Sequence, residues 1–450
     1  MSREACASVL LGAATFAWLL TLGGCSDGCG GNASSVNAPS TATHPAPQAP
    51  APALPATGAV PATLPRVLLV TYAQFRTGDR GEVQPGPARL EILRREGGEW
   101  HSEVLEDPES NVFHKAMVYE RTGAAPSVLT IGGSQAIVKL WHRGAASTWT
   151  SETLWSERFG GRFDRMRDVE VATLFSGEPP TILVGTHDQG VVAMLRPRAD
   201  SFEMTRLDAA PNTFIHEIEV GDLDRDGTLE VYASASEPNT LDGGEQPGHI
   251  YRYVPQRGGR REVVADFGQR HAKEILVADV DGDGHDELYA AVEALTAGGS
   301  GALEIREPVE IRRFDRPAAG GSVVIAQLSD RFTRFLTAGD VDGDGKRELV
   351  VAAFSSGLWL LRPPSTAGGQ WSLENFERES GGFEHASLLT DLDGDRRDEL
   401  YVASDNHGEL RRYDWVDGHP VRSVVTRRES ARSMITWNIM PAPVTALYAR

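Results

Sequence analysis

The sequence predicts an all-β fold, a seven-bladed β-propeller whose ring is closed by its C-terminal strand. Three observations predict it: an acidic pattern of nine residues that occurs four times, strand-like runs on both sides of each copy, and a unit that is split between the two ends of the folded region. The copies begin at residues 222, 279, 340 and 391, at intervals of 57, 61 and 51 residues. Repetition at this spacing, with short strands between polar turns, is typical of propeller blades.

The third copy shows what one unit contains. The strand-like runs Phe335–Ala338 and Leu349–Ala353 lie on either side of its acidic loop, and Leu358–Leu361 and Trp371–Glu374 follow them. Aliphatic, β-branched and aromatic residues dominate these runs, and polar turns separate them, which favours strands over helices. We therefore expect each unit to form one four-stranded blade.

The region before residue 222 repeats this plan without the acidic residues. The run Arg167–Thr173 aligns with His216–Asp222, but non-acidic residues replace the first three aspartates, so we expect no ion there. Another unit begins at His114–Glu120. The first folded unit has three strand-like runs, and the C-terminal run Arg432–Asn438 aligns with the innermost strands of the other units. This run can complete the first unit and remove a free sheet edge. The count is then seven blades, with six or eight as the alternatives.

The acidic loops are candidate calcium sites. Four carboxylates within nine residues repel one another unless a cation lies among them, and alternating acidic residues followed by glycine let a tight loop surround Ca²⁺ with oxygen atoms. Hard oxygen ligands favour Ca²⁺ over Zn²⁺ or Cu²⁺, and Mg²⁺, the alternative, suits fewer protein ligands. We expect about four Ca²⁺ ions, each held by side chains at loop positions 1, 3, 5 and 9 and by the carbonyl at position 7. The expected ligands are Asp222, Asp224, Asp226, Thr228 and Glu230; Asp279, Asp281, Asp283, His285 and Glu287; Asp340, Asp342, Asp344, Lys346 and Glu348; and Asp391, Asp393, Asp395, Arg397 and Glu399.

Position 6 distinguishes the fourth loop from the others. It is glycine in the first three loops and Arg396 in the fourth. Glycine permits a positive φ, whereas arginine there is strained, which we expect to weaken the fourth site by about 1 kcal/mol. The alternative, an EF-hand loop, needs a helix on both sides, and the flanking runs favour strands. We expect the ions to have a structural role, joining the two strands that each loop connects.

The third unit carries a recognisable family signature. The segment Phe332-Thr-Arg-Phe-Leu-Thr-Ala-Gly-Asp340-Val-Asp-Gly-Asp-Gly345-Lys-Arg-Glu-Leu-Val-Val resembles an FG-GAP, or VCBS-type, repeat. The resemblance is strong over 215–425 and weak over 65–210. The family includes the propeller of integrin α chains and many exported bacterial proteins, and it implies a Ca²⁺ in each acidic loop. It implies no single activity.

The N-terminus predicts export and a lipid anchor. Residues 1–24 contain a largely apolar run from Ala5 to Leu22, which is typical of a signal peptide. Leu22-Gly-Gly-Cys25 resembles a bacterial lipobox, so we expect Cys25 to be lipidated and to attach the chain to a bacterial membrane, with the outer membrane favoured. The alternatives are a plain secretory signal or a membrane-spanning anchor.

Composition separates a tether from the folded region. Residues 25–64 are rich in Ala, Pro and Ser and should form a disordered tether, followed by the propeller at 65–450. The folded region has no cysteine, which excludes a disulfide framework and a cysteine nucleophile there. The formal net charge of −19 argues against nucleic-acid binding.

A second repeated feature is a column of basic or imidazole side chains. Position six before the first aspartate of each acidic loop holds such a residue in all four units, and the other units align similarly. In a propeller this position lies near one mouth of the central channel, opposite the acidic loops, and we expect it to form a binding site for an anionic ligand. The alternative is pairing with the local acids Asp168, Glu217 and Glu274. The column consists of His114, Arg167, His216, Lys273, Arg334, His385 and Arg432.

Three classes of function fit these features. The sequence favours a non-catalytic binding or adhesion module on the cell envelope, for an anionic glycan or an acidic protein. The alternatives are a lyase-like enzyme acting on polysaccharide, with His114, His216 or His385 as base beside Arg167 or Arg334, and a structural subunit of an envelope complex. The sequence contains no Gly-rich phosphate loop, nucleophile elbow or His-Glu-x-x-His motif.

Overall fold

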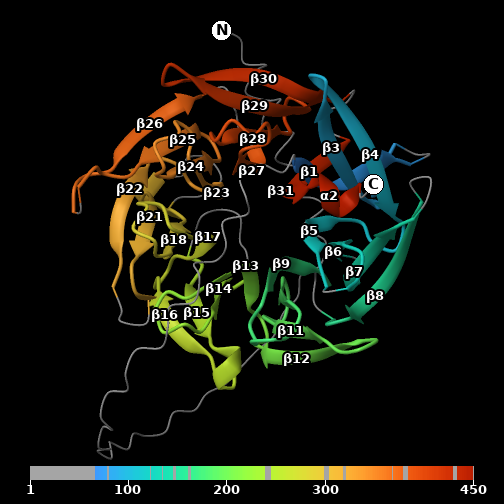
Figure 1. Cartoon of the computed structure of the whole chain (residues 1–450). Coiled ribbons are helices and arrows are strands. Elements are labelled where there is room, and N and C mark those ends of the chain that lie inside the picture. Colours follow the sequence, from blue (N-terminus) through green and yellow to red (C-terminus); the bar gives the residue numbers. More distant parts are fainter. Residues whose placement is uncertain are drawn as a thin grey trace, which may run out of the picture. The chain divides into compact units, whose positions relative to one another are not determined.

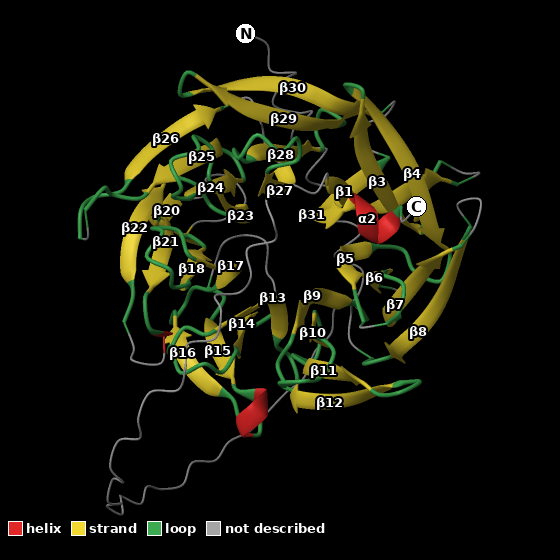
Figure 2. Cartoon of the chain, in the orientation of Figure 1, coloured by secondary structure: helices red, strands yellow, loops and turns green. Residues whose placement is uncertain are grey.

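Six antiparallel sheets of four strands and one of five form seven blades around a central axis in the computed structural model (Figure 1). This confirms the predicted all-β, seven-bladed propeller. In the described part of the chain, the helical elements are the short turns η2 (Pro255–Arg257) and α2 (Val444–Leu447) (Figure 2). The structure describes residues 66–448 except 79–80, 122, 134, 145–147, 161–163, 239–244, 298–303, 318–320, 367, 379–383 and 429–432.

The first blade is built from both ends of the folded region. Strand β31 (Met434–Pro443) pairs antiparallel with β1 (Arg66–Thr77), from Arg66 opposite Pro443 to Gln74 opposite Met434. The blade continues outward through β3 (Ala88–Glu96) and β4 (Glu99–Asp107), and β2 (Val83–Pro85) adds a hairpin to β1. The C-terminal strand is therefore the innermost strand of blade 1, and it closes the ring as predicted.

The other six blades each use four strands in chain order, from the innermost to the outermost. Two short strands, β19 (Leu295–Ala297) and β20 (Glu304–Glu307), form an additional hairpin within blade 5. The blade strands are β5 (Phe113–Tyr119), β6 (Ser127–Gly132), β7 (Ala136–Arg143) and β8 (Trp149–Glu157) in blade 2; β9 (Met166–Ala172), β10 (Thr181–Thr186), β11 (Val192–Pro197) and β12 (Phe202–Asp208) in blade 3; β13 (Phe214–Gly221), β14 (Glu230–Ser236), β15 (Gly248–Tyr253) and β16 (Glu262–Asp266) in blade 4; β17 (Ala272–Ala278), β18 (Glu287–Val292), β21 (Val309–Phe314) and β22 (Val323–Leu328) in blade 5; β23 (Thr333–Gly339), β24 (Glu348–Ala353), β25 (Gly357–Arg362) and β26 (Ser372–Glu377) in blade 6; and β27 (Glu384–Thr390), β28 (Glu399–Ser404), β29 (Glu409–Val416) and β30 (His419–Arg427) in blade 7.

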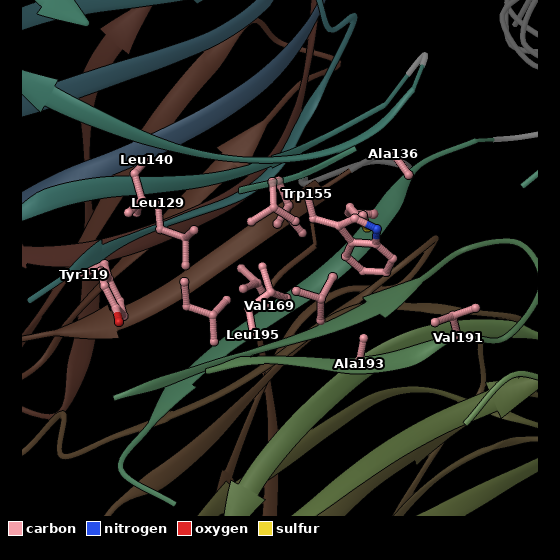
Figure 3. Close-up of a cluster of buried hydrophobic side chains, with 14 residues drawn as sticks. Tyr119, Leu129, Ala136, Leu140, Trp155, Val169, Val191, Ala193 and Leu195 are labelled. Atoms are coloured by element: carbon pink, nitrogen blue, oxygen red, sulfur yellow. The ribbon is translucent and has the colours of Figure 1, made fainter. Parts of the chain in front are cut away.

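The core lies between neighbouring blades. The second strand of each blade is covered on both faces, and every residue of β14, β18, β24 and β28 is buried. Between blades 2 and 3, Tyr119, Leu129, Val169 and Leu195 pack into one apolar cluster (Figure 3). Burial of these side chains removes apolar surface from water and holds adjacent sheets face to face. The innermost strands are thereby fixed around the axis, where they position the two candidate sites.

Some predictions concern residues that the structure does not describe. The signal peptide at 1–24, the tether at 25–64, the lipidated Cys25 and the basic residue Arg432 all lie outside the described residues. Within the part of the chain that is described, no helix is long and apolar enough to pass through a membrane.

Candidate metal loops and bulge ring

The four acidic loops connect the first and second strands of blades 4 to 7, as predicted. Each loop begins after the innermost strand and ends at the glutamate of position 9, which is the first residue of the second strand. Glu230, Glu287, Glu348 and Glu399 are consequently buried. Burial raises the pKa of the first three to about 7 and that of Glu399 to about 8. A nearby cation would oppose this effect.

One hydrogen-bond pattern shapes all four loops. In the third loop, the Asp340 carboxylate accepts hydrogen bonds from the backbone N–H groups of Gly343 at 2.7 Å and Gly345 at 2.9 Å. The Asp344 carboxylate accepts one from the N–H of Lys346 at 2.8 Å. In the other loops the position 1 carboxylate also accepts the N–H of position 6, and the N–H of position 7 (Thr228, His285 or Arg397) also bonds to the position 5 carboxylate. The loops are therefore folded around their own carboxylates.

Each loop brings three carboxylates close enough to share one cation. One oxygen atom from each of the three lies within 4.8 Å of the other two. One buried oxygen atom each of Asp224 and Asp281 has no hydrogen-bond partner, and such hard oxygen donors suit a divalent ion. The remaining predicted side chains, Asp226, Glu287, Glu348 and Asp395, belong to the loops but not to these groups of three. The groups are Asp222, Asp224 and Glu230; Asp279, Asp281 and Asp283; Asp340, Asp342 and Asp344; and Asp391, Asp393 and Glu399.

Two loops contain a strained backbone residue. Arg396 has φ 71° at position 6 of the fourth loop, as the sequence predicted. Arg225 has φ 65° at position 4 of the first loop, where the other loops have glycines with φ between 74° and 83°. The sequence analysis overlooked Arg225, although the glycine at position 4 of the other three loops was a visible signal. Each such residue costs about 1–2 kcal/mol relative to ordinary helical or extended backbone.

The predicted basic column coincides with a β-bulge in the innermost strands. The pairing register of these strands shifts by one residue near its start, and the extra residue is the basic or imidazole one in blades 2 to 6. In blade 7 the irregularity lies between Glu384 and Ser387 and includes His385. In blade 1 the extra residue is Trp437. We call this set of bulged residues the bulge ring: His114, Arg167, His216, Lys273, Arg334, His385 and Trp437.

Trp437 is the member of the bulge ring that the sequence analysis missed. The Arg432 alignment placed the closing strand five residues too early to identify it. The Trp437 ring lies 4.4 Å from the His114 ring, centre to centre, and the Arg167 guanidinium lies 5.7 Å from the Trp437 ring centre. Residues from blades 1, 2 and 3 therefore meet at this end of the axis, opposite the acidic loops.

His216 belongs to the bulge ring but carries no charge at neutral pH. Burial lowers its pKa well below the ordinary value, and His271, Lys273 and Arg167 lower it further. Its Nε2 lies 2.7 Å from the Ser236 hydroxyl, which itself donates to a backbone carbonyl. His216 Nε2 therefore carries the proton and donates to Ser236. The positive charge of the bulge ring comes from Arg167, Lys273 and Arg334.

The predicted alternative, local pairing with acids, is found in part, because Glu274 interacts electrostatically with Arg167, Lys273 and Arg334. Asp168 pairs with Lys115 at 3.1 Å and accepts the N–H of Ile218, and Glu217 accepts the N–H of Ile275. Among the described residues, the side chains of Arg167 and Lys273 form no hydrogen bond or ion pair within 4.0 Å. Burial and the nearby Arg334 lower the pKa of Lys273 to about 7, and burial raises that of Glu274 to about 7.

Comparisons with known proteins support the fold alone. No family model matches the chain, and no curated protein matches it. A protein of known structure from Lactobacillus plantarum is 12% identical over 84% of this chain and 100% of its own, with a TM-score of 0.54. A candidate 6-phosphogluconolactonase from Bacteroides fragilis is 11% identical over 84% of this chain and 98% of its own, with a TM-score of 0.46. A functionally unknown protein from Desulfotomaculum acetoxidans is 10% identical over 83% of this chain and 99% of its own, also with a TM-score of 0.46. Fold and site together define a β-propeller with acidic inter-strand loops that could hold metal ions.

Proposed function

We propose that this protein is an exported, lipid-anchored FG-GAP or VCBS-type propeller that binds an anionic ligand at the bulge ring and is stabilised by Ca²⁺ in its acidic loops. The observation that carries the proposal is the recurrence of a bulge at one place in all seven innermost strands. Bulges redirect side chains and are frequent beside functional sites. Here they direct basic and aromatic groups to one end of the axis.

The charges at the bulge ring support an anionic ligand. Arg167, Lys273 and Arg334 are half-buried. Burial and then repulsion from Arg334 lower the pKa of Lys273. An anion among them would relieve this repulsion and accept charge-assisted hydrogen bonds. Carboxylate, sulfate and phosphate groups have this chemistry, so an acidic glycan or an acidic protein loop fits the site.

Binding can be tested with a charge-matched pair of variants. The ring variant replaces Arg167, Lys273 and Arg334 with Gln. The control variant replaces Arg198, Arg261 and Arg422 with Gln as well. These three arginines are exposed on outer parts of blades 3, 4 and 7. On an array of acidic and neutral glycans, the ring variant should bind acidic glycans at least about tenfold more weakly than the wild type, while the control should bind within about twofold. Equal loss in both variants, or none in either, would refute the site.

A second candidate function is a lyase-like enzyme. It is favoured by Lys273, because a lysine with a pKa of about 7 can act as a base near neutral pH beside the cation Arg334. Incubation of the full chain with uronic-acid polymers distinguishes the two functions. Unsaturated products, followed by ultraviolet absorbance, would establish the enzyme, and binding without products would establish the binding module.

The anchor and the ions have their own tests. Replacement of Cys25 with Ser should release the chain from the membrane fraction, since lipidation needs the thiol. Elemental analysis of the purified chain should find calcium, and chelation should lower its melting temperature because bound ions stabilise the folded state. If the purified chain contains no calcium and chelation does not change its melting temperature, the Ca²⁺ part of the proposal is refuted. The proposed anion site at the bulge ring would not be affected by that result.

A further inference from the structure

The first acidic loop already contains a cation of its own. Arg252, from the third strand of blade 4, pairs with Glu230 at 2.6 Å and also contacts Asp224. The same guanidinium pairs with Glu262 of the outermost strand at 2.9 Å. Tyr232 donates its hydroxyl hydrogen to Glu230 at 3.0 Å. Two carboxylates of the candidate metal group are therefore compensated by the protein itself.

The same arrangement recurs in blades 5 and 7. Arg313 pairs with Asp281 at 2.8 Å and with Glu287 at 3.1 Å. In the fourth loop Arg412 pairs with the carboxylates of positions 3 and 9, both at 2.9 Å. Tyrosines on the second strands, Tyr289 and Tyr401, again donate to the glutamates. Three of the four loops thus share an arginine on the third strand that pairs with the carboxylates of positions 3 and 9.

In the third loop, this pairing of an arginine with positions 3 and 9 is not found among the described residues. In the pairing register of blade 6, Leu360 lies opposite Val350, where blade 4 has Arg252 opposite Tyr232. Glu348 is only 3% exposed. Among the described residues no cationic group lies within 4.0 Å of Glu348 or of the three aspartates of its loop. Arg362 of the third strand pairs with Glu374 at 3.1 Å and reaches Glu348 only through a longer-range electrostatic interaction. The buried glutamate accepts one hydrogen bond, from the N–H of Val341.

The backbone of the third loop is also relaxed. Gly343 and Gly345 occupy both positions that need a positive φ. The first loop has Arg225 and the fourth has Arg396 at one of these positions. The second loop has glycine at both, and it differs from the third in containing Arg313. Loops two and three are therefore a matched pair that differ in the counter-cation.

We infer that Arg252, Arg313 and Arg412 are built-in counter-cations and that the loop from Asp340 to Glu348 alone depends on a divalent cation from solution. A buried carboxylate without a direct ion pair is costly, so the third loop gains the most from an ion. In the other loops an entering ion meets a guanidinium that already occupies two ligand carboxylates, and fewer net ligand charges mean weaker binding. This goes beyond the proposed function, which assigns Ca²⁺ to the acidic loops without ranking them by this arginine.

Calorimetric titration of Ca²⁺ into the chelator-treated full chain tests the inference. We expect one site that binds at least about tenfold more tightly than any other. Asp342→Asn should remove this tight site, whereas the matched Asp281→Asn in the second loop should leave it in place. Arg313→Met should create a second tight site, and Arg312→Met, which alters the neighbouring arginine paired with Glu310 at 2.6 Å, should not.

Hydrogen exchange provides a measurement that needs no variant. Chelation should reduce backbone protection in β23 and β24 of blade 6 while β13 and β14 of blade 4 keep theirs, because Arg252 remains in the first loop. Four equivalent sites, an unchanged titration for Arg313→Met, uniform loss of protection in both blades, or no binding of Ca²⁺ would each overturn the inference. The first three results would be compatible with the proposal that Ca²⁺ stabilises the propeller, whereas the last would also refute that proposal.

Discussion

Asp340 and Asp398 join two neighbouring acidic loops through a reciprocal pair of hydrogen bonds. The N–H of Asp340 donates to the Asp398 carboxylate at 2.8 Å, and the N–H of Asp398 donates to the Asp340 carbonyl at 2.7 Å. Blades 5 and 6 are linked similarly, since the N–H of Arg347 donates to the Val280 carbonyl at 3.0 Å. The loops therefore connect adjacent blades as well as adjacent strands.

Replacement of Asp398 with Ala should weaken the link between blades 6 and 7. The N–H of Asp340 would lose its acceptor in a half-buried place, and we expect the free energy of unfolding to fall by about 1–3 kcal/mol. Urea unfolding in the presence of Ca²⁺ measures the change. Glu304→Ala is the control, because Glu304 is exposed and forms no side-chain bond among the described residues. A loss no larger than that of the control would contradict this role for Asp398.

Lys115 compensates buried acids on the axis, and its replacement with Met should be strongly destabilising. Its ammonium group lies 3.1 Å from Asp168 and also contacts Glu170. Removing it leaves buried carboxylates without a counter-charge, which should cost about 3–5 kcal/mol at pH 7. Adding Asp168→Asn to this variant should recover part of the loss, since one of the stranded charges is then removed.

The cost of Lys115→Met should also depend on pH. Burial raises the pKa of Glu170, so the folded state binds this proton more tightly than the unfolded state does. Protonation therefore favours the folded chain, and stability falls as the pH rises above the ordinary glutamate pKa. Unfolding of the variant measured at pH 5 and pH 8 should show the smaller loss at pH 5. An equal loss of stability at both pH values would show that the uncompensated negative charge is not on Glu170.

Arg396→Gly should stabilise the protein. Arg396 has φ 71°, a conformation that costs about 1–2 kcal/mol for a residue with a Cβ atom. Glycine removes this strain but adds entropy to the unfolded chain, so we expect a net gain of about 0.5–1 kcal/mol. Arg397→Gly is the control, because Arg397 has no positive φ and only the entropic cost applies. Thermal unfolding of both variants gives the comparison, and a gain from Arg397→Gly alone would contradict the assignment of strain.

Most of the fold could be predicted because its signals are local. The acidic loops fix where the first strand ends and the second begins, and the run Leu349–Ala353 falls within β24. The closing strand was recognisable because the N-terminal unit lacked one strand. The position of Trp437 could not be predicted, because a bulge depends on how β31 pairs with β1 and no acidic loop marks that strand.

The candidate metal loops were only half visible in the sequence. The aspartates occupy alternate positions of one short segment, but the arginine that compensates them lies much later in the chain, 28 residues after Asp224 in the case of Arg252. Their contact follows from the pairing of Tyr232 with Arg252 across two strands. A single sequence gives no such register, so three compensated loops and one uncompensated loop looked alike.

Anion binding at the bulge ring should weaken as the pH rises from 6 to 8. Lys273, with a pKa of about 7, loses its charge over this range, while Glu274 and Glu293, with pKa values of about 7 and 8, gain theirs. Both changes make the site less positive. A bound anion favours the protonated forms of these groups, so the protein takes up protons when the anion binds. The affinity for the anion therefore falls as the pH rises, by up to about tenfold per pH unit for each proton taken up.

The shift in melting temperature caused by an oligogalacturonate at pH 6 and at pH 8 measures this dependence. We expect a larger shift at pH 6. Lys273→Arg should reduce the difference, since arginine stays charged at both values, and Lys273→Arg combined with Glu274→Gln should reduce it further because the opposing carboxylate is also removed. An equal shift for the wild type at both pH values would mean that these groups do not face the ligand, whereas a pH dependence unchanged in both variants would place its origin elsewhere in the chain.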